Sequence, residues 1–359
     1  MNKLMVLSLA AIFAAPLAQA EVSITGSVRT ALEYVSPDST GVKAGSKSDG
    51  ENKLLLNDQS SRIRFSGVDK LDFGGDLVWV LESRFRVGDP YNKEGTAFGS
   101  RDTYIGYKGD FGFARFGKMD NAYKNIYKNI APALEGSMND SSSYMGSSSM
   151  LRRLGDRQGS VIFYETPSLG GFGAQASYTI GEKTDKVDPS DYNIGAFYKD
   201  KMFNVGASYS LKDDQNSDYK SSKISSKATS GASISGYMVG ANVNYADFGL
   251  GATWERVTRD DGKMSRDQDT YAVAATYKVD KFSFQAAYLN VNDVDSYADS
   301  GADQYTLAAA YSLSKRTRLI GSYSQVNNDK NSTFTTESGY SVNAGQDVGF
   351  FAVGVRSDF

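Results

Sequence analysis

Val353-Gly354-Val355-Arg356-Ser357-Asp358-Phe359 closes this 359-residue chain and has the period of a half-buried β-strand. Every second residue counted back from the end belongs to a mostly apolar row: Phe359, Ser357, Val355, Val353 and Phe351. The residues between them are polar or small: Asp358, Arg356, Gly354 and Ala352. Because successive side chains of a strand point to opposite faces, the pattern predicts a strand with one apolar and one polar face.

The first twenty residues have the features of a secretory signal peptide. Lys3 supplies positive charge, residues 4–15 are apolar, and Ala18-Gln19-Ala20 is a small-x-small cleavage site. A transmembrane anchor would need about 20 apolar residues, and Pro16 and Gln19 interrupt this stretch too early. We therefore expect residues 1–20 to be removed and residues 21–359 to form one exported domain.

Composition limits the classes of function. The chain has no cysteine and no histidine, which excludes disulfides, Ser-His and Cys-His nucleophiles and the commonest transition-metal ligand. We expect no catalytic residue, no metal and no cofactor, although carboxylate and Ser-Lys chemistry stay open. Without Lys3, 38 of the 39 basic residues face 42 acidic ones, a net charge of -4. This mild acidity gives no reason to expect nucleic acid as a partner.

Alternating segments recur along the body of the chain. One segment runs over residues 271–279, turns at Asp280-Lys281 and continues over residues 282–288, with aromatic and aliphatic residues on one face. The same unit recurs over residues 192–211 and 237–254. The other face is polar and includes Gln175, Ser177, Asn204, Ser208, Asn242 and Asn244. Aromatic residues flank each tight turn, where they would form a girdle at one depth of a membrane.

The connections between these segments alternate between short and long. Seven short turns fall near residues 73–75, 110–112, 168–170, 200–201, 246–247, 280–281 and 314–315. Eight longer polar stretches separate them: residues 36–59, 88–99, 119–158, 182–190, 212–232, 260–267, 293–302 and 327–346. A soluble sandwich would have turns of similar length at both ends, whereas outer-membrane barrels have short turns on one side only. The pattern predicts an all-β fold, a 16-stranded antiparallel transmembrane β-barrel around an aqueous channel.

One connection, about residues 119–158, is far longer than the usual few residues between strands. It contains apolar residues that are unusual in a segment fully exposed to water: Ile126, Tyr127, Ile130, Leu134 and Met138. Such residues suit a loop packed against a wall, although length alone does not say which way the loop folds.

Four stretches carry a family resemblance. They are residues 22–29, Ser61-Arg62-Ile63-Arg64-Phe65-Ser66-Gly67, residues 160–172 and residues 353–359. In order and spacing they resemble the first strand, the S-R-[IL]-x-F-x-G second strand, the strand and turn after the third loop, and the closing strand of Gram-negative general porins. The neisserial and β-proteobacterial type is the most similar, and the resemblance covers essentially the whole mature chain.

The resemblance implies a homotrimeric outer-membrane porin whose third loop folds inward to form the constriction. Its partners would be outer-membrane lipid, further copies of itself, and the outer-membrane assembly machinery, which would recognise the closing strand and its terminal Phe359. Ions and small hydrophilic solutes would cross it by passive diffusion.

In such porins, basic wall residues face acidic groups on the third loop. Arg62 matches the family's basic residue on the second strand, Arg29 falls where the family often has Lys, and Lys118 where it often has Arg. Parity places Arg29 and Arg62 opposite lipid-facing neighbours, and it adds further inward residues: Arg64, Glu82, Arg84 and Arg86. Inward placement is favoured because Arg facing lipid would cost about 2–4 kcal/mol at the midplane.

The acidic side departs from the family's Pro-Glu-Phe-Gly-Gly-type stretch. This loop offers Glu135 and Asp140, with Asp120 where it begins. The predicted constriction is therefore Arg29, Arg62, Arg64, Arg84, Arg86, Lys118, Glu135 and Asp140. Its basic excess predicts a mild preference for anions despite the net negative charge.

Three functions remain compatible with the sequence. A passive diffusion channel follows from the width and the charged waist. A substrate-specific outer-membrane channel would carry aromatic residues along its lumen, whereas most rings here alternate outward. A secreted β-sandwich adhesin is the alternative from another class, and it would show no detergent requirement.

Overall fold

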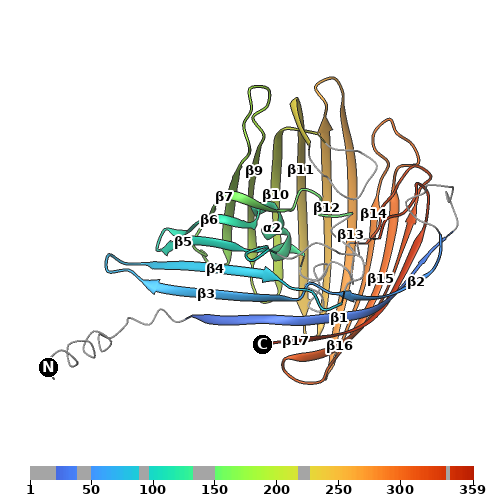
Figure 1. The fold of residues 1–359 in the computed structure, drawn as a ribbon, viewed down its shortest axis with the longest axis horizontal. Coiled ribbons are helices and arrows are strands. Elements are labelled where there is room, and N and C mark those ends of the chain that lie inside the picture. The colour runs from blue at the N-terminus through green and yellow to red at the C-terminus, as the bar shows by residue number, and fades with distance from the viewer. Residues whose placement is uncertain (1–21, 39–49, 89–96, 132–149, 217–226, 337–339) are drawn as a thin grey trace, which may run out of the picture.

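The computed structural model describes residues 22–38, 50–88, 97–131, 150–216, 227–336 and 340–359. Within these ranges, strands β1 to β17 form one antiparallel sheet (Figure 1). The strand bounds are β1 Ser23–Pro37, β2 Lys53–Asp58, β3 Arg62–Lys70, β4 Asp76–Arg84, β5 Thr103–Gly109, β6 Gly112–Asp120, β7 Arg157–Glu165, β8 Phe172–Ile180, β9 Ser190–Lys199, β10 Phe203–Asn216, β11 Lys227–Tyr245, β12 Phe248–Asp260, β13 Ser265–Val279, β14 Phe282–Val291, β15 Ala302–Ser312, β16 Thr317–Asn328 and β17 Val348–Asp358. The predicted signal peptide lies outside the described residues.

The sheet closes into a barrel because β1 pairs on both of its edges. On one edge it pairs with β17, from Ser27 opposite Asp358 to Pro37 opposite Val348. On the other edge its second half pairs with β2 and its first half with β3. β2 and β3 are therefore two parts of one barrel strand, interrupted where Ser60 has a φ of 65°. Counted this way, the barrel has 16 strands, and the predicted fold class is confirmed.

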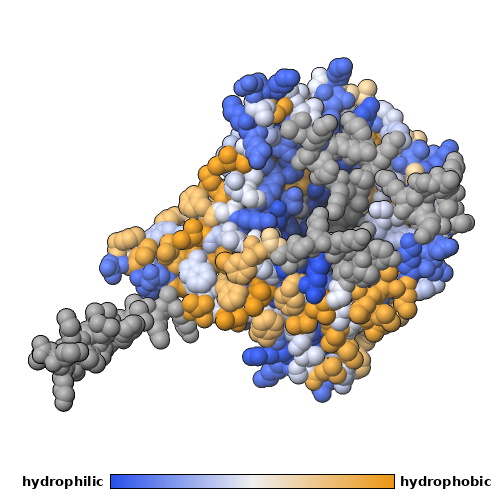
Figure 2. All heavy atoms as spheres, in the orientation of Figure 1, coloured by the Kyte–Doolittle hydropathy of each residue, from blue (hydrophilic) through white to orange (hydrophobic). Residues whose placement is uncertain are grey.

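The two faces of the wall differ as strand parity predicts. Outward residues such as Leu250 and Leu307 are exposed, whereas lumen-facing residues such as Asn242 and Gln304 are buried. Figure 2 shows the apolar residues as a band across the wall, with hydrophilic residues at both ends. Because hydrocarbon offers no hydrogen-bond partner, the closed ladder satisfies the backbone inside this band.

Aromatic rings on the outward face pair across neighbouring strands at two levels. Beside the short turns the ring pairs are Phe172–Tyr198, Phe248–Tyr277 and Phe282–Tyr311. Nearer the long loops they are Tyr178–Tyr192, Tyr209–Tyr237 and Tyr288–Tyr305. The girdle expected at the tight turns is thus matched by a second one at the other edge of the apolar band.

Some strands are longer than the sequence pattern predicts. Lys53–Asp58 forms β2 inside the predicted loop 36–59, and β10 and β11 both extend into the predicted loop 212–232. These extensions pair polar residues, as where Asp213 lies opposite Ser233. Alternating hydropathy marks only the part of a strand that crosses the apolar band, so the pattern predicts shorter strands than the structure has.

The long third loop begins with a helix that lies inside the barrel. Helix α2, Ala122–Ile130, packs against β9, β10 and β11 (Figure 1). Asn121 caps it, because its side chain accepts a hydrogen bond from the Lys124 backbone. Within the described residues no helix is long and apolar enough to cross a membrane.

Candidate pore constriction

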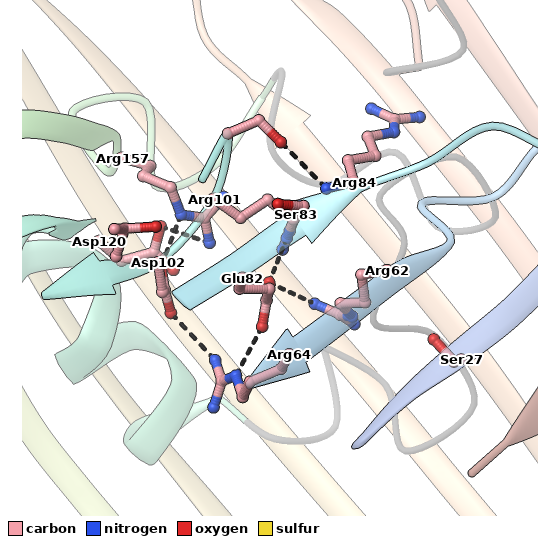
Figure 3. A network of polar contacts seen from close by, with 12 residues as sticks. Ser27, Arg62, Arg64, Glu82, Ser83, Arg84, Arg101, Asp102, Asp120 and Arg157 are labelled. Carbon is pink, nitrogen blue, oxygen red and sulfur yellow. Dashed lines mark hydrogen bonds and ion pairs between the residues drawn. The ribbon is translucent and has the colours of Figure 1, made fainter. Parts of the chain in front are cut away.

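Glu82 of β4 is the centre of a charged network on the lumen wall (Figure 3). Its carboxylate lies 2.7 Å from Arg64 Nε and 3.9 Å from Arg62 Nη1, and it also pairs with Arg101. Arg62 and Arg64 reach it from β3, since β3 and β4 are neighbours and Arg64 lies directly opposite Glu82 in the register. One carboxylate is thus shared by three guanidinium groups.

Two further carboxylates extend this network toward the third loop. Asp102, just before β5, lies 3.3 Å from Arg64 Nη2 and 2.6 Å from Arg157 Nε. Asp120, the last residue of β6, lies 3.0 Å from Arg157 Nη2. Asp120 also pairs with the two lysines of α2, at 3.0 Å from Lys124 Nζ and 2.7 Å from Lys128 Nζ. The wall and the helix are therefore joined by continuous ion pairs.

The interruption between β2 and β3 holds a fourth carboxylate. Asp58 accepts hydrogen bonds from the backbone N–H groups of Ser60 and Ser61, and it pairs with Arg84 Nη2 at 3.1 Å. Ser61 also bridges to β1, where its hydroxyl accepts from the Arg29 N–H and donates to the Arg29 carbonyl. The break in the strand thus fixes the position of Arg84 on the wall.

Three further predicted residues, Arg29, Arg86 and Lys118, lie outside the ion pairs around Glu82. Arg29 is buried on the lumen side of β1, with its Nε donating to Ser27 Oγ at 2.7 Å. Arg86 follows the end of β4 and is partly buried. Lys118 pairs in register with Thr103, which itself pairs with Leu81. Lys118 therefore lies in the row of Leu81, on the opposite face from Glu82, and the structure does not bring it to the network.

The acidic partners also differ from those predicted. Glu135 and Asp140 lie outside the described residues, and the acids in contact with the arginines are on the wall or at strand ends. Several members of the network were not predicted as constriction residues: Asp58, Arg101, Asp102, Asp120, Lys124, Lys128 and Arg157. Part of this network could have been predicted from a short stretch of sequence around the start of α2. Asp120, Lys124 and Lys128 have the spacing of one helix face, and Asn121 is a favourable helix cap.

The described network is basic in balance. Continuous ion pairs join six basic residues (Arg62, Arg64, Arg101, Lys124, Lys128, Arg157) to three acidic ones (Glu82, Asp102, Asp120), and Arg84 and Asp58 form a separate pair beside them. Burial lowers the pKa of Lys124 to about 8, opposed by the neighbouring Asp120 carboxylate. Burial is also the largest cause that lowers the pKa of Arg101, with Arg157 and Arg62 beside it. The network therefore presents a net positive field to the lumen at neutral pH.

A second polar cluster fixes the returning limb of the third loop. Glu255 of β12 accepts hydrogen bonds from the Tyr123 hydroxyl at 2.7 Å and from the Arg153 backbone N–H at 2.9 Å. The Arg153 guanidinium lies 3.6 Å from the same carboxylate and donates to Gln268 Oε1 at 2.6 Å. Tyr123 precedes the undescribed part of the loop and Arg153 follows it, so one buried carboxylate holds both limbs.

A closed barrel with a polar lumen, a charged network on its wall and a loop folded inward is the architecture of a membrane channel. Comparison with known proteins identifies the family. A Gram-negative porin family model matches residues 7–332, which shows that the chain belongs to this family. The chain is an outer-membrane porin, a water-filled channel for passive diffusion of ions and small hydrophilic solutes.

Individual relatives agree with this family. The chain is 24% identical over 326 residues to the major outer membrane protein P.IB of Neisseria meningitidis serogroup A, spanning 89% of this chain and 91% of that protein. It is 28% identical over 208 residues to the P.IB protein of Neisseria sicca, spanning 58% and 54% of the two chains. The anion-selective porin from Comamonas acidovorans has the same fold, with a TM-score of 0.75, 22% identity and coverage of 94% and 99%.

Proposed function

We propose that the described network is the constriction of this porin and that it gives the channel a mild preference for anions. The observation that carries the proposal is the excess of basic residues, six against three, among the ion pairs that join the wall to α2, with the separate pair of Arg84 and Asp58 beside them. Fixed charges at a narrow point act at close range, so they outweigh the more distant charges on external loops.

The structural neighbour supports the sign of this preference. The Comamonas acidovorans porin is described as anion-selective, and it has the same fold as this chain. In this chain Arg29 adds a further cation on the lumen side of β1, beside a pocket that Arg62 and Arg64 also line. These groups favour an anion at the waist and disfavour a cation.

Reversal potential in a salt gradient across a planar bilayer tests this proposal. Arg62→Gln together with Arg64→Gln should move the reversal potential toward cations, because two charges beside Glu82 are lost. The matched control is Lys183→Gln with Lys186→Gln, which removes two charges from the exposed connection between β8 and β9. A clearly cation-selective wild type, or an unmoved reversal potential in the arginine variant, would show that this network does not set ion preference.

We also propose that the protein is a homotrimer whose signal peptide, residues 1–20, is removed on export.

Phe359 would serve the assembly machinery as the end of the closing strand. It also closes the barrel, since its N–H donates to the Gly26 carbonyl at 3.0 Å and its carboxylate oxygen accepts from the Gly26 N–H at 2.9 Å. Deletion of Phe359 should lower the amount of SDS-resistant, heat-modifiable protein. Unchanged assembly at ordinary expression levels would contradict this role.

A further inference from the structure

Four glycines leave a strip without side chains on the lumen wall of β9, β10 and β11. This glycine strip consists of Gly195, Gly206, Gly236 and Gly240. Gly206 and Gly240 are direct partners in the β10–β11 register. The outward neighbours of this pair, Val205 and Val239, are 44% and 46% exposed, so the glycines themselves face the lumen.

The third loop occupies the space that side chains would otherwise fill. A Cβ on Gly195 would lie 2.6 Å from Ile126 Cγ1. Ile130 covers the paired glycines, at 2.9 Å from the Cβ position of Gly206 and 3.2 Å from that of Gly240. These distances are shorter than ordinary van der Waals contacts, so a larger residue at these positions would displace the isoleucine side chains of the loop that lie over it.

Seating on the strip also orients the charged face of the helix. Tyr123, Ile126 and Ile130 of α2 are completely buried against the wall. Lys124 and Lys128 lie on another face of the helix and pair with Asp120. Because residues three and four apart share a helix face, turning or lifting α2 would move both lysines relative to the arginines of β3.

We propose that the glycine strip is the seat that holds the third loop in the lumen, and that it thereby sets the aperture of the pore. The strip has a positioning role, because none of its members carries a group that touches the solute. This inference rests on the proposed constriction. The inference goes beyond the proposed constriction because it assigns the size of the aperture to the uncharged glycine strip, which lies across the barrel from the arginines.

A substitution at Gly236 can distinguish a role in holding the loop from a role in the packing of the sheet itself. A Cβ there would lie 2.8 Å from Leu154 Cδ1 and 3.4 Å from the Tyr123 hydroxyl, both of which belong to the loop, while its nearest backbone atom, the Arg256 carbonyl oxygen, lies at 3.2 Å. At Gly206, by contrast, a Cβ would meet the Ala196 carbonyl oxygen at 2.4 Å, so substitution there would disturb the sheet itself. Gly236 is therefore the position at which a larger side chain acts mainly on the loop.

The test is the single-channel conductance of Gly236→Val in planar bilayers. Valine adds three carbons under Leu154, so the loop should shift into the lumen and the conductance should fall at least twofold. Leu154→Ala removes three carbons at the same point, and the double variant should recover most of the wild-type conductance. Gly321→Val is the matched control, because a Cβ on that strand glycine has no heavy atom within 4 Å.

Each outcome decides the proposal. Wild-type conductance in Gly236→Val, or a loss that Leu154→Ala does not repair, would overturn the seat. If Gly236→Val fails to assemble as heat-modifiable protein, Gly236→Ala should still lower conductance, and an unchanged value there would equally overturn it. The readout is a ratio of variant to wild-type conductance, so it is independent of the sign of ion selectivity. A wild type without anion preference would therefore contradict the proposed function and leave this test intact.

Discussion

The two sides of the pore show opposite uses of the same strand geometry. On the arginine wall, β3 and β4 direct long charged side chains into the lumen, where Arg62 and Arg64 share the carboxylate of Glu82. On the glycine wall, β9, β10 and β11 present no side chains at Gly195, Gly206 and Gly240, and the loop fills the space. The charged wall faces solute, whereas the bare wall is covered by protein.

Under the two proposals, this difference separates the choice of ion from the size of the aperture. Arg64 is 36% exposed and its partner Glu82 is 3% exposed, so this ion pair lies between exposed pairs, which contribute about 0–1 kcal/mol each to stability, and fully buried pairs, which cost more to break. Burial of a large aliphatic side chain contributes about 1.5–3 kcal/mol, and Ile126 and Ile130 are fully buried. Changes on the arginine wall should therefore alter selectivity with little effect on the loop, and changes under the loop should do the reverse.

The largest expected effect comes from the buried carboxylate that holds both limbs of the loop. Glu255→Gln leaves the Arg153 guanidinium buried without its counter-charge, which costs about 3–5 kcal/mol. The loop should leave its seat for part of the time, seen as frequent conductance substates in single-channel records. Glu165→Gln is the control, since Glu165 pairs with Arg115 at the far end of β7. If single-channel records of Glu255→Gln show no more substates than wild type, the loop is held by other contacts.

The next effect is loss of packing on the glycine strip. Ile130→Ala should leave a cavity over Gly206 and Gly240 and weaken the seat by about 2–5 kcal/mol. We expect faster cleavage within the third loop by added protease. Ile162→Ala, on the outward face of β7, should leave loop cleavage as in wild type. If both variants behave alike, packing over the strip contributes nothing to the seat.

On the arginine wall the expected effect is smaller and falls on a different measurement. Glu82→Gln removes the negative charge that three arginines share, so anions should be favoured more strongly. A charge at 4 Å is worth about 1 kcal/mol in water, and screening reduces it, so the anion-to-cation permeability ratio should rise roughly two- to threefold. Glu182→Gln, on an exposed connection, serves as the control. A shift toward cations would reverse the assignment of the wall.

The sequence predicts the arginine wall better than the glycine wall, and the reason is geometric. Arg62 and Arg64 lie on one strand, and parity within that strand is sufficient to point both inward. The glycine strip is assembled from three strands, and its alignment depends on a register such as that of Gly206 and Gly240, which one strand does not reveal. The apolar residues of the loop indicated a packed segment, but they did not indicate its seat.

Residues at strand ends are also poorly predicted from the sequence. Asp102, Asp120 and Arg157 lie where strands meet loops, so alternation gives no face for them. Lys118 came from family position alone, and the register places it in the row of Leu81 instead. The interruption at Ser60 was hidden as well, because its positive φ occurs at a serine and not at a glycine. Strand interiors could thus be read from the sequence, and strand ends could not.

The smallest effect joins the two walls, because Lys124 is carried by the seated helix and faces the charged network. Burial lowers the pKa of Lys124 to about 8, and the chain has no histidine or cysteine to titrate nearby. Lys124 is mostly protonated at pH 7 and mostly neutral at pH 9.5, so raising the pH removes a positive charge and should weaken anion preference. The permeability ratio should change by no more than the two- to threefold expected for Glu82→Gln, since one charge near 4 Å is worth about 1 kcal/mol before screening reduces it. Reversal potentials at the two pH values measure this change, and Lys124→Gln should abolish it. If the variant keeps the full pH response, the titrating group lies elsewhere.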